Sequence, residues 1–327
     1  MSDVETDLGT DIRAVARKLL KGMVVPLLGA GVNACGRPDP FTWDPRDKRH
    51  LPTGGELAAF LAKEFDAPEE LAKTEDLIRV SQFIDSVQSS GGELYQTLHE
   101  IFDADFELGP VHTFLARTAP LLRERNHLQV ILTTNYDDAL ERAFENAGEP
   151  YDLITYIVSS PKEFRGRFMH WAPGEPPPPP TVIESANDYR LGPEKRTVIL
   201  KLHGAVQRLE SSEKDNYVIT EDHYIEYLTH TDITSQLPSV VTDKLRNSSY
   251  LFLGYGMKDW NLRAILRRIW GEQTTTFGSW AIQKSVDAME QAFWEKRNVK
   301  ILQLDLEEYM ALLSAALDRR IAEEAVP

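Results

Sequence analysis

The sequence predicts an α/β fold: a Rossmann-like, doubly wound parallel sheet with a helical insertion. Short apolar runs of strand length recur along the chain, and segments whose apolar residues repeat at helical spacing lie between them. Strands that alternate with amphipathic helices form a parallel sheet covered on both faces. No segment repeats at a fixed period of about 20–50 residues, which excludes a solenoid.

The first part of the chain is predicted to hold one helix, one strand and a helical layer. Apolar spacing predicts a helix over residues 11–21, and "MVVPLL" (23–28) predicts a short buried strand. Pro26 is unfavourable inside that strand because proline cannot donate to a sheet ladder. Residues 55–125 carry several apolar helical stretches and few β-branched runs, so we expect an inserted helical layer there.

The rest of the chain alternates strands and helices. Apolar runs predict strands over residues 129–134, 197–204, 249–256, 279–283 and 299–304, with helices over 136–147, 262–270, 286–296 and 306–318. Residues 157–196 have the weakest pattern and contain "PGEPPPPP" (173–180), which cannot lie inside a helix or a sheet. We expect an irregular surface excursion there, within a single domain over residues 1–327.

The composition limits the classes of function. The chain has 327 residues, of which 42% are hydrophobic and 27% charged, with a formal net charge of -15 at pH 7. This charge argues against direct binding to nucleic acid or to a membrane through bulk electrostatics. No apolar run approaches the roughly 20 residues that cross a bilayer. The acidic N-terminal sequence is unlike a signal peptide, so we expect a cytoplasmic protein.

Metal and P-loop chemistry are disfavoured by the motifs. Cys35 is the only cysteine, which excludes a disulfide framework within the chain and a Cys-rich zinc site. Neither H-E-x-x-H nor the P-loop pattern G-x-x-x-x-G-K-[ST] occurs in the sequence. We therefore expect no metal.

Small and polar residues gather at the ends of four predicted strands. These ends read "LLGAGVN", "LTTNYDD", "LKLHGAV" and "FLGYGMKD". Ligands of open parallel sheets bind at the carboxyl ends of the strands. The four segments are therefore candidates for one ligand site.

Each segment also has a purely structural interpretation. Gly29 and Gly31 could admit a phosphate at the following helix, but G-x-G-x-x-G is incomplete because position 34 is Ala, and a simple turn explains them about as well. Helix capping explains Asn135 or Asp137, but does not require both. A turn and a cap would account for "GYGMKD" (254–259).

His203 is a candidate for proton transfer. It ends a strongly apolar strand and is followed by Gly204. A lone histidine is usually structural, but imidazole is the side chain best suited to accept a proton near neutral pH.

Taken together, the four segments resemble the sirtuin (Sir2) family. That family carries Gly-Ala-Gly, then T-Q-N-I-D, then His-Gly, then a Gly-rich strand end, and here the same order reads "GAGVN", "TTNYD", "KLHG" and "GYGMKD". Sirtuin deacylases generally add a zinc ribbon of two C-x-x-C pairs, which a chain with one cysteine lacks. Asn33, Thr134 and Tyr136 replace the Ser, Gln and Ile of the family pattern. The chain looks closer to the zinc-free bacterial SIR2-like subfamily, which is associated with NAD cleavage in antiphage defence.

This resemblance implies cleavage of the nicotinamide–ribose bond of NAD+, the only cofactor-type molecule expected and here the substrate. It implies that Asn135 holds the water or the ribose, that Asp137 holds the nicotinamide carboxamide, and that His203 accepts a proton from a ribose hydroxyl or the water. The other residues expected to contact NAD+ are Gly29, Ala30, Gly31, Asn33, Thr134, Tyr136, Gly254, Gly256 and Asp259. Nicotinamide leaves as a neutral molecule from a cationic pyridinium. No general acid is then needed, in contrast to ordinary glycoside hydrolysis.

Alternatives to hydrolysis remain open at this point. A zinc-free NAD-dependent deacylase or ADP-ribosyltransferase would use the same site with another nucleophile, and a non-catalytic NAD or ADP-ribose-binding subunit would bind without turnover. An uncontrolled NAD hydrolase would harm its own cell, so some gating is expected. The resemblance implies a homo-oligomer, a partner defence protein such as a HerA-like ATPase or an Argonaute-like protein, or both.

Overall fold

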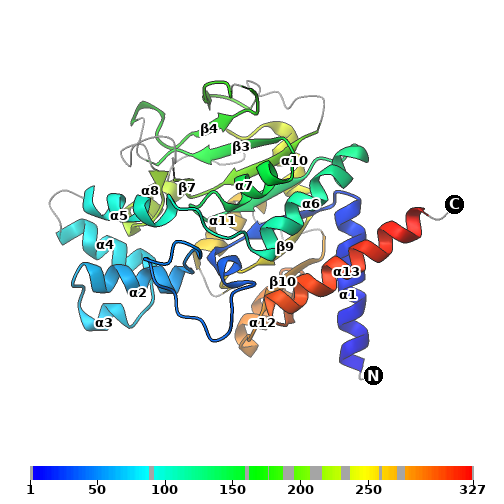
Figure 1. Ribbon diagram of the computed structural model, residues 1–327, viewed down its shortest axis with the longest axis horizontal. Helices are drawn as coiled ribbons and strands as arrows, with labels where there is room; N and C mark the ends of the chain where they lie inside the picture. The colour runs from blue at the N-terminus through cyan, green and yellow to red at the C-terminus, as the bar shows by residue number, and fades with distance from the viewer. Residues whose placement is uncertain are drawn as a thin grey trace.

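A nine-stranded sheet forms the centre of the computed structural model (Figure 1), which describes residues 3–87, 92–158, 162–175, 177–186, 195–206, 216–229, 236–257, 260–270 and 277–325. The strand order is β11-β10-β9-β1-β2-β6-β3-β4-β5. The strands are β1 (Val24–Leu28), β2 (Val130–Thr133), β3 (Tyr151–Tyr156), β4 (Phe168–Trp171), β5 (Thr181–Ile183), β6 (Thr197–Lys201), β9 (Ser249–Leu253), β10 (Ser279–Gln283) and β11 (Val299–Gln303). A separate two-stranded ribbon joins β7 (Gly204–Ala205) to β8 (Asn216–Tyr217).

The sheet is parallel from β11 to β3, and only β4 and β5 pair in the antiparallel sense. β1 lies at the switch point: the chain runs from it to β2, β6 and β3 on one side, and later to β9, β10 and β11 on the other. Such a switch point leaves a crevice beyond the carboxyl ends of the strands. The predicted α/β, doubly wound fold class is confirmed.

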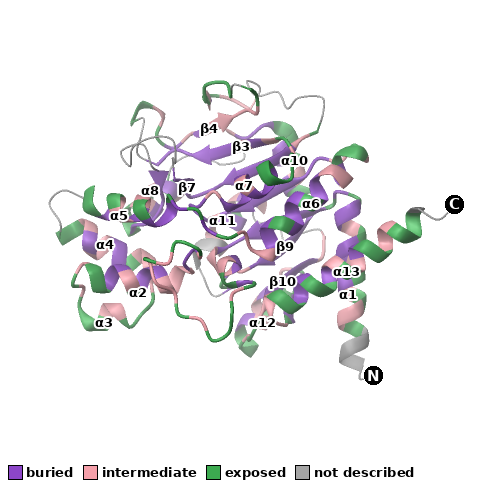
Figure 2. Ribbon diagram, viewed as in Figure 1, coloured by how far each residue is buried: buried purple, intermediate pink, exposed green. Residues whose placement is uncertain are grey.

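Helices cover both faces of the sheet. One face carries α1 (Asp3–Leu20), α6 (Pro110–Glu124), α7 (Ala139–Asn146) and α13 (Leu306–Ala325), and the other carries α8 (Glu221–Thr229), α10 (Ser239–Arg246), α11 (Trp260–Trp270) and α12 (Ala288–Glu295). In β1, Val25 and Leu27 pack on the second group while Val24 and Leu28 pack on the first, as the alternation of a strand requires. Figure 2 shows the resulting buried band through the sheet. Among the described residues, no helix combines the length and apolar character needed to span a membrane.

The helical insertion divides into two parts. α2 (Gly54–Glu64), α3 (Glu69–Ala72), α4 (Leu77–Val87) and α5 (Gly92–Phe102) form a cluster of their own beside the sheet (Figure 1), whereas α6 packs on the sheet with α7 and α13. The start of α2 is fixed by a capping box in which Thr53 and Glu56 each bond the other's backbone N–H. Tyr136 and Tyr217 pack into the same cluster, so the insertion contacts the strand ends.

Some elements differ from the sequence expectation. Pro26 lies inside β1, but pairing with β2 begins only at Leu27, so the missing N–H of Pro26 falls where that ladder starts. The interval 157–196, expected to be irregular, contributes β4, β5 and a short 3-10 helix η2 (Lys162–Phe164). The helix expected over 136–147 begins at Ala139, so Tyr136 and Asp137 lie in a loop.

Candidate functional site

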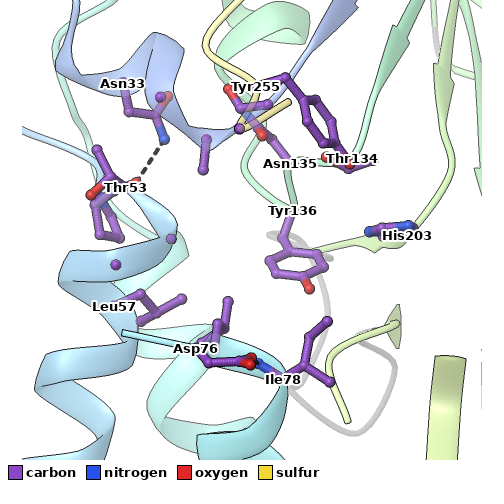
Figure 3. A pocket seen from close by; sticks show the side chains of 18 of the residues that line it. Asn33, Thr53, Leu57, Asp76, Ile78, Thr134, Asn135, Tyr136, His203 and Tyr255 are labelled. Carbon is purple, nitrogen blue, oxygen red and sulfur yellow. Dashed lines mark hydrogen bonds between the residues drawn. The ribbon is translucent and has the colours of Figure 1, made fainter. Parts of the chain in front are cut away.

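A cavity of about 870 Å³ lies at the carboxyl ends of β1, β2, β6 and β9, where the helical insertion faces the sheet (Figure 3). Among the residues that line it are Gly29, Ala30, Gly31, Asn33, Thr134, Asn135, Tyr136, Asp137, His203, Gly254 and Gly256. Asp259 lies outside the described residues. The structure thus brings together segments from four strand ends around one space, whose size suits a nucleotide-sized ligand.

The two glycine-rich strand ends pack backbone against backbone. The Gly31 N–H donates to the carbonyl of Gly254 (2.8 Å), and the Gly29 N–H donates to Leu253 (3.0 Å). Gly254 has φ +63°, and a Cβ on it would lie 2.1 Å from the backbone nitrogen of Val32. Close approach of the two loops therefore requires glycine here.

The α-helix that would follow the "GAG" turn and aim its N–H groups at a phosphate does not begin after Gly31. The structure instead has a five-residue 3-10 helix, η1 (Ala30–Ala34), and the next α-helix begins only at Gly54. The N–H of Gly31 is already taken by Gly254, and that of Val32 by Gly29 (3.1 Å). These glycines line the cavity, and their contact with a phosphate stays a prediction.

Asn135 is held by its neighbours but keeps one polar atom without a partner. Its backbone N–H donates to Thr133 Oγ1 (3.0 Å), and its Nδ2 donates to the carbonyl of Gly29 (3.5 Å). The side chain is buried, yet its Oδ1 accepts no hydrogen bond from any described residue. The amide is therefore anchored through its Nδ2, while its Oδ1 is buried.

Asp137 helps to cap helix α7, which was the purely structural interpretation of this residue. Its Oδ1 accepts from the N–H of Ala139 (3.1 Å), at the start of α7. Its backbone carbonyl accepts from Nζ of Lys201, a side chain that is 1% exposed. Lys201 also pairs with Glu141 (2.7 Å), whose pKa is raised by burial. A buried cation thus ties the end of β6 to the loop that carries Asn135 and Asp137.

Tyr136 forms a fixed wall between the sheet and the insertion. Its hydroxyl donates to the carbonyl of Val218 (2.8 Å), and its ring meets Tyr217 and Phe102 edge-on. Figure 3 shows it between Asn135 on one side and Ile78 with Asp76 on the other.

His203 lies in the turn after β6 and points into the cavity (Figure 3). The imidazole is 3% exposed, and burial lowers the pKa of His203 to about 3, so the ring is neutral at pH 7. Its Nδ1 lies 3.2 Å from the hydroxyl of Tyr224, while its Nε2 has no hydrogen-bond partner among the residues that the structure describes. The backbone requires a glycine at position 204. Its φ is +80°, and a Cβ would lie 1.9 Å from the carbonyl oxygen of Asn216 in β8.

Three residues that line this cavity each carry a buried polar atom without a hydrogen-bond partner in the part of the chain that the structure describes. These atoms are Asn33 Oδ1, Asn135 Oδ1 and His203 Nε2. Asn33 is held by its Nδ2, which donates to the carbonyl of Pro52 (3.0 Å; Figure 3). Buried polar groups are normally hydrogen-bonded, and leaving one unpaired costs about 1–3 kcal/mol. Polar groups of a ligand in this cavity are candidates for the missing partners.

Sequence reasoning missed the half of the cavity that the insertion and α8 supply. These residues are Pro52, Thr53, Gly54, Gly55, Leu57, Glu75, Asp76, Leu77, Ile78, Arg79, Phe102, Glu221, Tyr224 and Ile225, and Tyr255 joins them from the turn after β9. The Thr53–Glu56 capping box is a readable helix start, but nothing local shows which ligand edge it faces. Within the described residues, no group of three or more His, Cys, Asp or Glu side chains is arranged to hold a metal ion.

Comparison with known proteins places this site in a family. A family model described as "SIR2-like domain" matches residues 129–302, more than half of the chain. An NAD(+) hydrolase ThsA of Acinetobacter baumannii (strain 532279) is 24% identical over 200 residues, which are 61% of this chain and 32% of that protein. An NAD(+) hydrolase ThsA of Cytobacillus dafuensis is 23% identical over 201 residues, 61% of this chain and 31% of that protein. The chain thus spans about a third of the length of these relatives. The match includes the turns that carry Asn135, His203 and Gly254, and the chain belongs to the SIR2-like domain family.

Proposed function

We propose that the chain is an NAD+ hydrolase that cleaves the bond between nicotinamide and ribose. Water adds to the anomeric carbon of the ribose, and the bonding pair of the broken C–N bond stays on the departing neutral nicotinamide. The second product is ADP-ribose, and one proton is released. Because the leaving group already carries the positive charge, the site must supply orientation and acceptors rather than an acid.

The observation that carries this proposal is the set of three unpartnered atoms at the switch point of the sheet. Asn33 Oδ1, Asn135 Oδ1 and His203 Nε2 offer acceptors or a donor to one ligand in one cavity. Ribose hydroxyls, a carboxamide and a water molecule are partners of matching chemistry. The match to relatives named NAD(+) hydrolase supports the same conclusion.

We assign roles to the residues as follows. Asn135 orients the water or the ribose through its free Oδ1. His203 takes the proton of the water or of a ribose hydroxyl on Nε2, for which it must be neutral, and its lowered pKa keeps it so. Asp137 holds the nicotinamide carboxamide with the carboxylate oxygen that does not cap α7.

Beside the residues of the "GAG" turn, the diphosphate of NAD+ has a second candidate partner. The N–H groups of Gly31 and Val32 are occupied by backbone carbonyls. Among the described residues that line the cavity, Arg79 is the only lysine or arginine. We therefore propose that Arg79 attracts the diphosphate, while Gly254 and Gly256 face the adenosine part.

The test is release of nicotinamide from NAD+ by the purified chain, followed by chromatography of both products. Asn135→Ala and His203→Ala should each abolish release while circular dichroism stays unchanged. The matched control is His127→Ala, which removes a partly exposed histidine just before β2, at the opposite end of the strand from the cavity. Full activity in either site variant would remove the mechanism. Binding of NAD+ without products would leave a non-catalytic subunit, and acyl-peptide turnover would indicate the deacylase.

The biological role is a further part of the proposal. The motif resemblance supports an antiphage effector that depletes NAD+, gated by self-assembly or by a partner protein. Assaying the chain alone and with the product of its genomic neighbour would test this, because a gated effector should gain activity on mixing.

A further inference from the structure

We propose that Tyr224 is a positioning residue that fixes the tautomer of His203, with the proton on Nδ1 and the Nε2 lone pair facing the cavity. The tautomer itself is a property of the folded chain. Its effect on turnover rests on the NAD+ hydrolase function proposed above.

The geometry joins the two side chains closely. Tyr224 lies in α8, is buried, and places its hydroxyl 3.2 Å from His203 Nδ1. The two rings meet edge-on, with centroids 5.1 Å apart and planes at 84°. Tyr227, one helical turn later, meets the same imidazole with centroids 5.7 Å apart at 84°. The ring of His203 is therefore held on two sides and cannot turn freely.

A neutral imidazole has one N–H, so its two nitrogens cannot play the same role. If Nδ1 donates to the oxygen of Tyr224, Nε2 is left as an acceptor, which is what a proton-accepting residue in this cavity needs. If Nε2 instead carried the proton, it would repel an incoming O–H donor. The Tyr224 hydroxyl can donate to Nδ1 or accept from it, and only the second arrangement, which we propose, turns the Nε2 lone pair towards the cavity.

Tyr224 is itself held in place by the helical insertion. The two residues before it bind α4 and α5: the N–H of Asp222 donates to Gln82 Oε1 (3.1 Å), and His223 Nε2 lies 3.3 Å from the hydroxyl of Tyr95. Gln82 also donates to the carboxylate of Asp222 (3.2 Å). The insertion therefore fixes α8, and α8 fixes the imidazole.

The experiment compares Tyr224→Phe with Tyr227→Phe. Both variants remove one hydroxyl from a ring against His203, but among the described residues the hydroxyl of Tyr227 has no hydrogen-bond partner, and Tyr227 is not among the residues that line the cavity. The chain is labelled with ¹⁵N-histidine, and long-range ¹H–¹⁵N spectra identify the tautomer; His203→Gln assigns its signals. The wild type and Tyr227→Phe should show protonated Nδ1, and Tyr224→Phe should show a mixture of tautomers.

Turnover supplies the second readout. Loss of one hydrogen bond to the reacting ring should lower kcat for NAD+ about ten-fold in Tyr224→Phe, with KM changed less than about two-fold. Tyr227→Phe should keep kcat within about two-fold of the wild type.

The spectra decide the inference whether or not the chain hydrolyses NAD+. A wild-type chain with protonated Nε2, or a Tyr224→Phe chain whose tautomer does not change, would overturn it. An unchanged kcat in Tyr224→Phe would show that the hydroxyl of Tyr224 does not contribute to turnover. If no variant releases nicotinamide while the spectra behave as expected, the proposed function fails and the positioning role stands.

Discussion

Replacing Gly254 by alanine should destabilise the protein by about 2–5 kcal/mol. Its φ of +63° costs a residue with a Cβ about 1–2 kcal/mol. The new Cβ would lie 2.1 Å from the nitrogen of Val32 and 2.6 Å from the carbonyl carbon of Gly31. Those atoms are backbone, so the loops must separate, and overpacking of that kind costs about 1–3 kcal/mol more. The free energy of unfolding is measured by urea denaturation with a common slope.

Two other glycines separate the two causes. Gly148 has φ +66° and nothing within 4 Å of the position that a Cβ would take, so Gly148→Ala should cost only the backbone part, about 1–2 kcal/mol. Gly256 has no described atom within 4 Å of its Cβ position and no positive φ, so Gly256→Ala should change stability by less than about 1 kcal/mol. If Gly254→Ala costs no more than Gly148→Ala, the close backbone packing of the two strand ends is not as described.

Four further predictions follow from the buried ionisable groups. With its pKa lowered to about 3, His203 should leave kcat/KM flat from pH 7 to pH 5, whereas an ordinary pKa of 6.5 would lower it about 25-fold; a fall of that size would contradict the assignment. As the pH falls, His203 takes up its proton first in the unfolded state, because its pKa there is the ordinary 6.5. The contribution of His203 to the free energy of unfolding should therefore be complete above pH 6.5 and should fall by about 1.4 kcal/mol per pH unit below it. Urea unfolding measured against pH should show a less steep fall in His203→Gln. Lys201→Met should cost about 3–5 kcal/mol in a urea titration because Glu141 is left buried without its cation, and adding Glu141→Leu should restore part of the loss; no loss in the single variant would mean that the pair is not buried as described. Burial raises the pKa of Cys35 to about 12, so a thiol reagent at pH 8 should label it slowly in the native protein and quickly in urea, and fast native labelling would show that the thiol is exposed.

The parallel core could be predicted because its signals are local. β1, β2, β6, β9 and β10 are mostly apolar runs buried along nearly their whole length, as strands covered on both faces need, and β11 buries Val299, Ile301 and Leu302. β3 was missed because Asp152 interrupts its apolar pattern. The structure buries that carboxylate by pairing it with His170 Nε2 (2.8 Å) from β4 and Arg196 Nε (3.1 Å) from the segment before β6. Partners that lie 18 and 44 residues away leave no trace in a short window of sequence.

The candidate site was predictable to a similar extent. Polar and small residues at strand ends indicated where a ligand would lie, because parallel strands end at one edge. The sequence predicted that the glycines lie at strand ends, but it did not predict their contact with each other. The contact between Gly31 and Gly254 joins residues more than two hundred positions apart. Tyr224 carries no motif, and its importance comes from the three-dimensional position of α8 against His203.

The most direct measurement is a crystal structure of Asn135→Ala soaked with NAD+. Our account predicts the nicotinamide ribose in the cavity between position 135 and Nε2 of His203, with the rest of the dinucleotide along Gly254 and Gly256. An empty cavity at saturating NAD+, or a dinucleotide bound elsewhere on the chain, would contradict it.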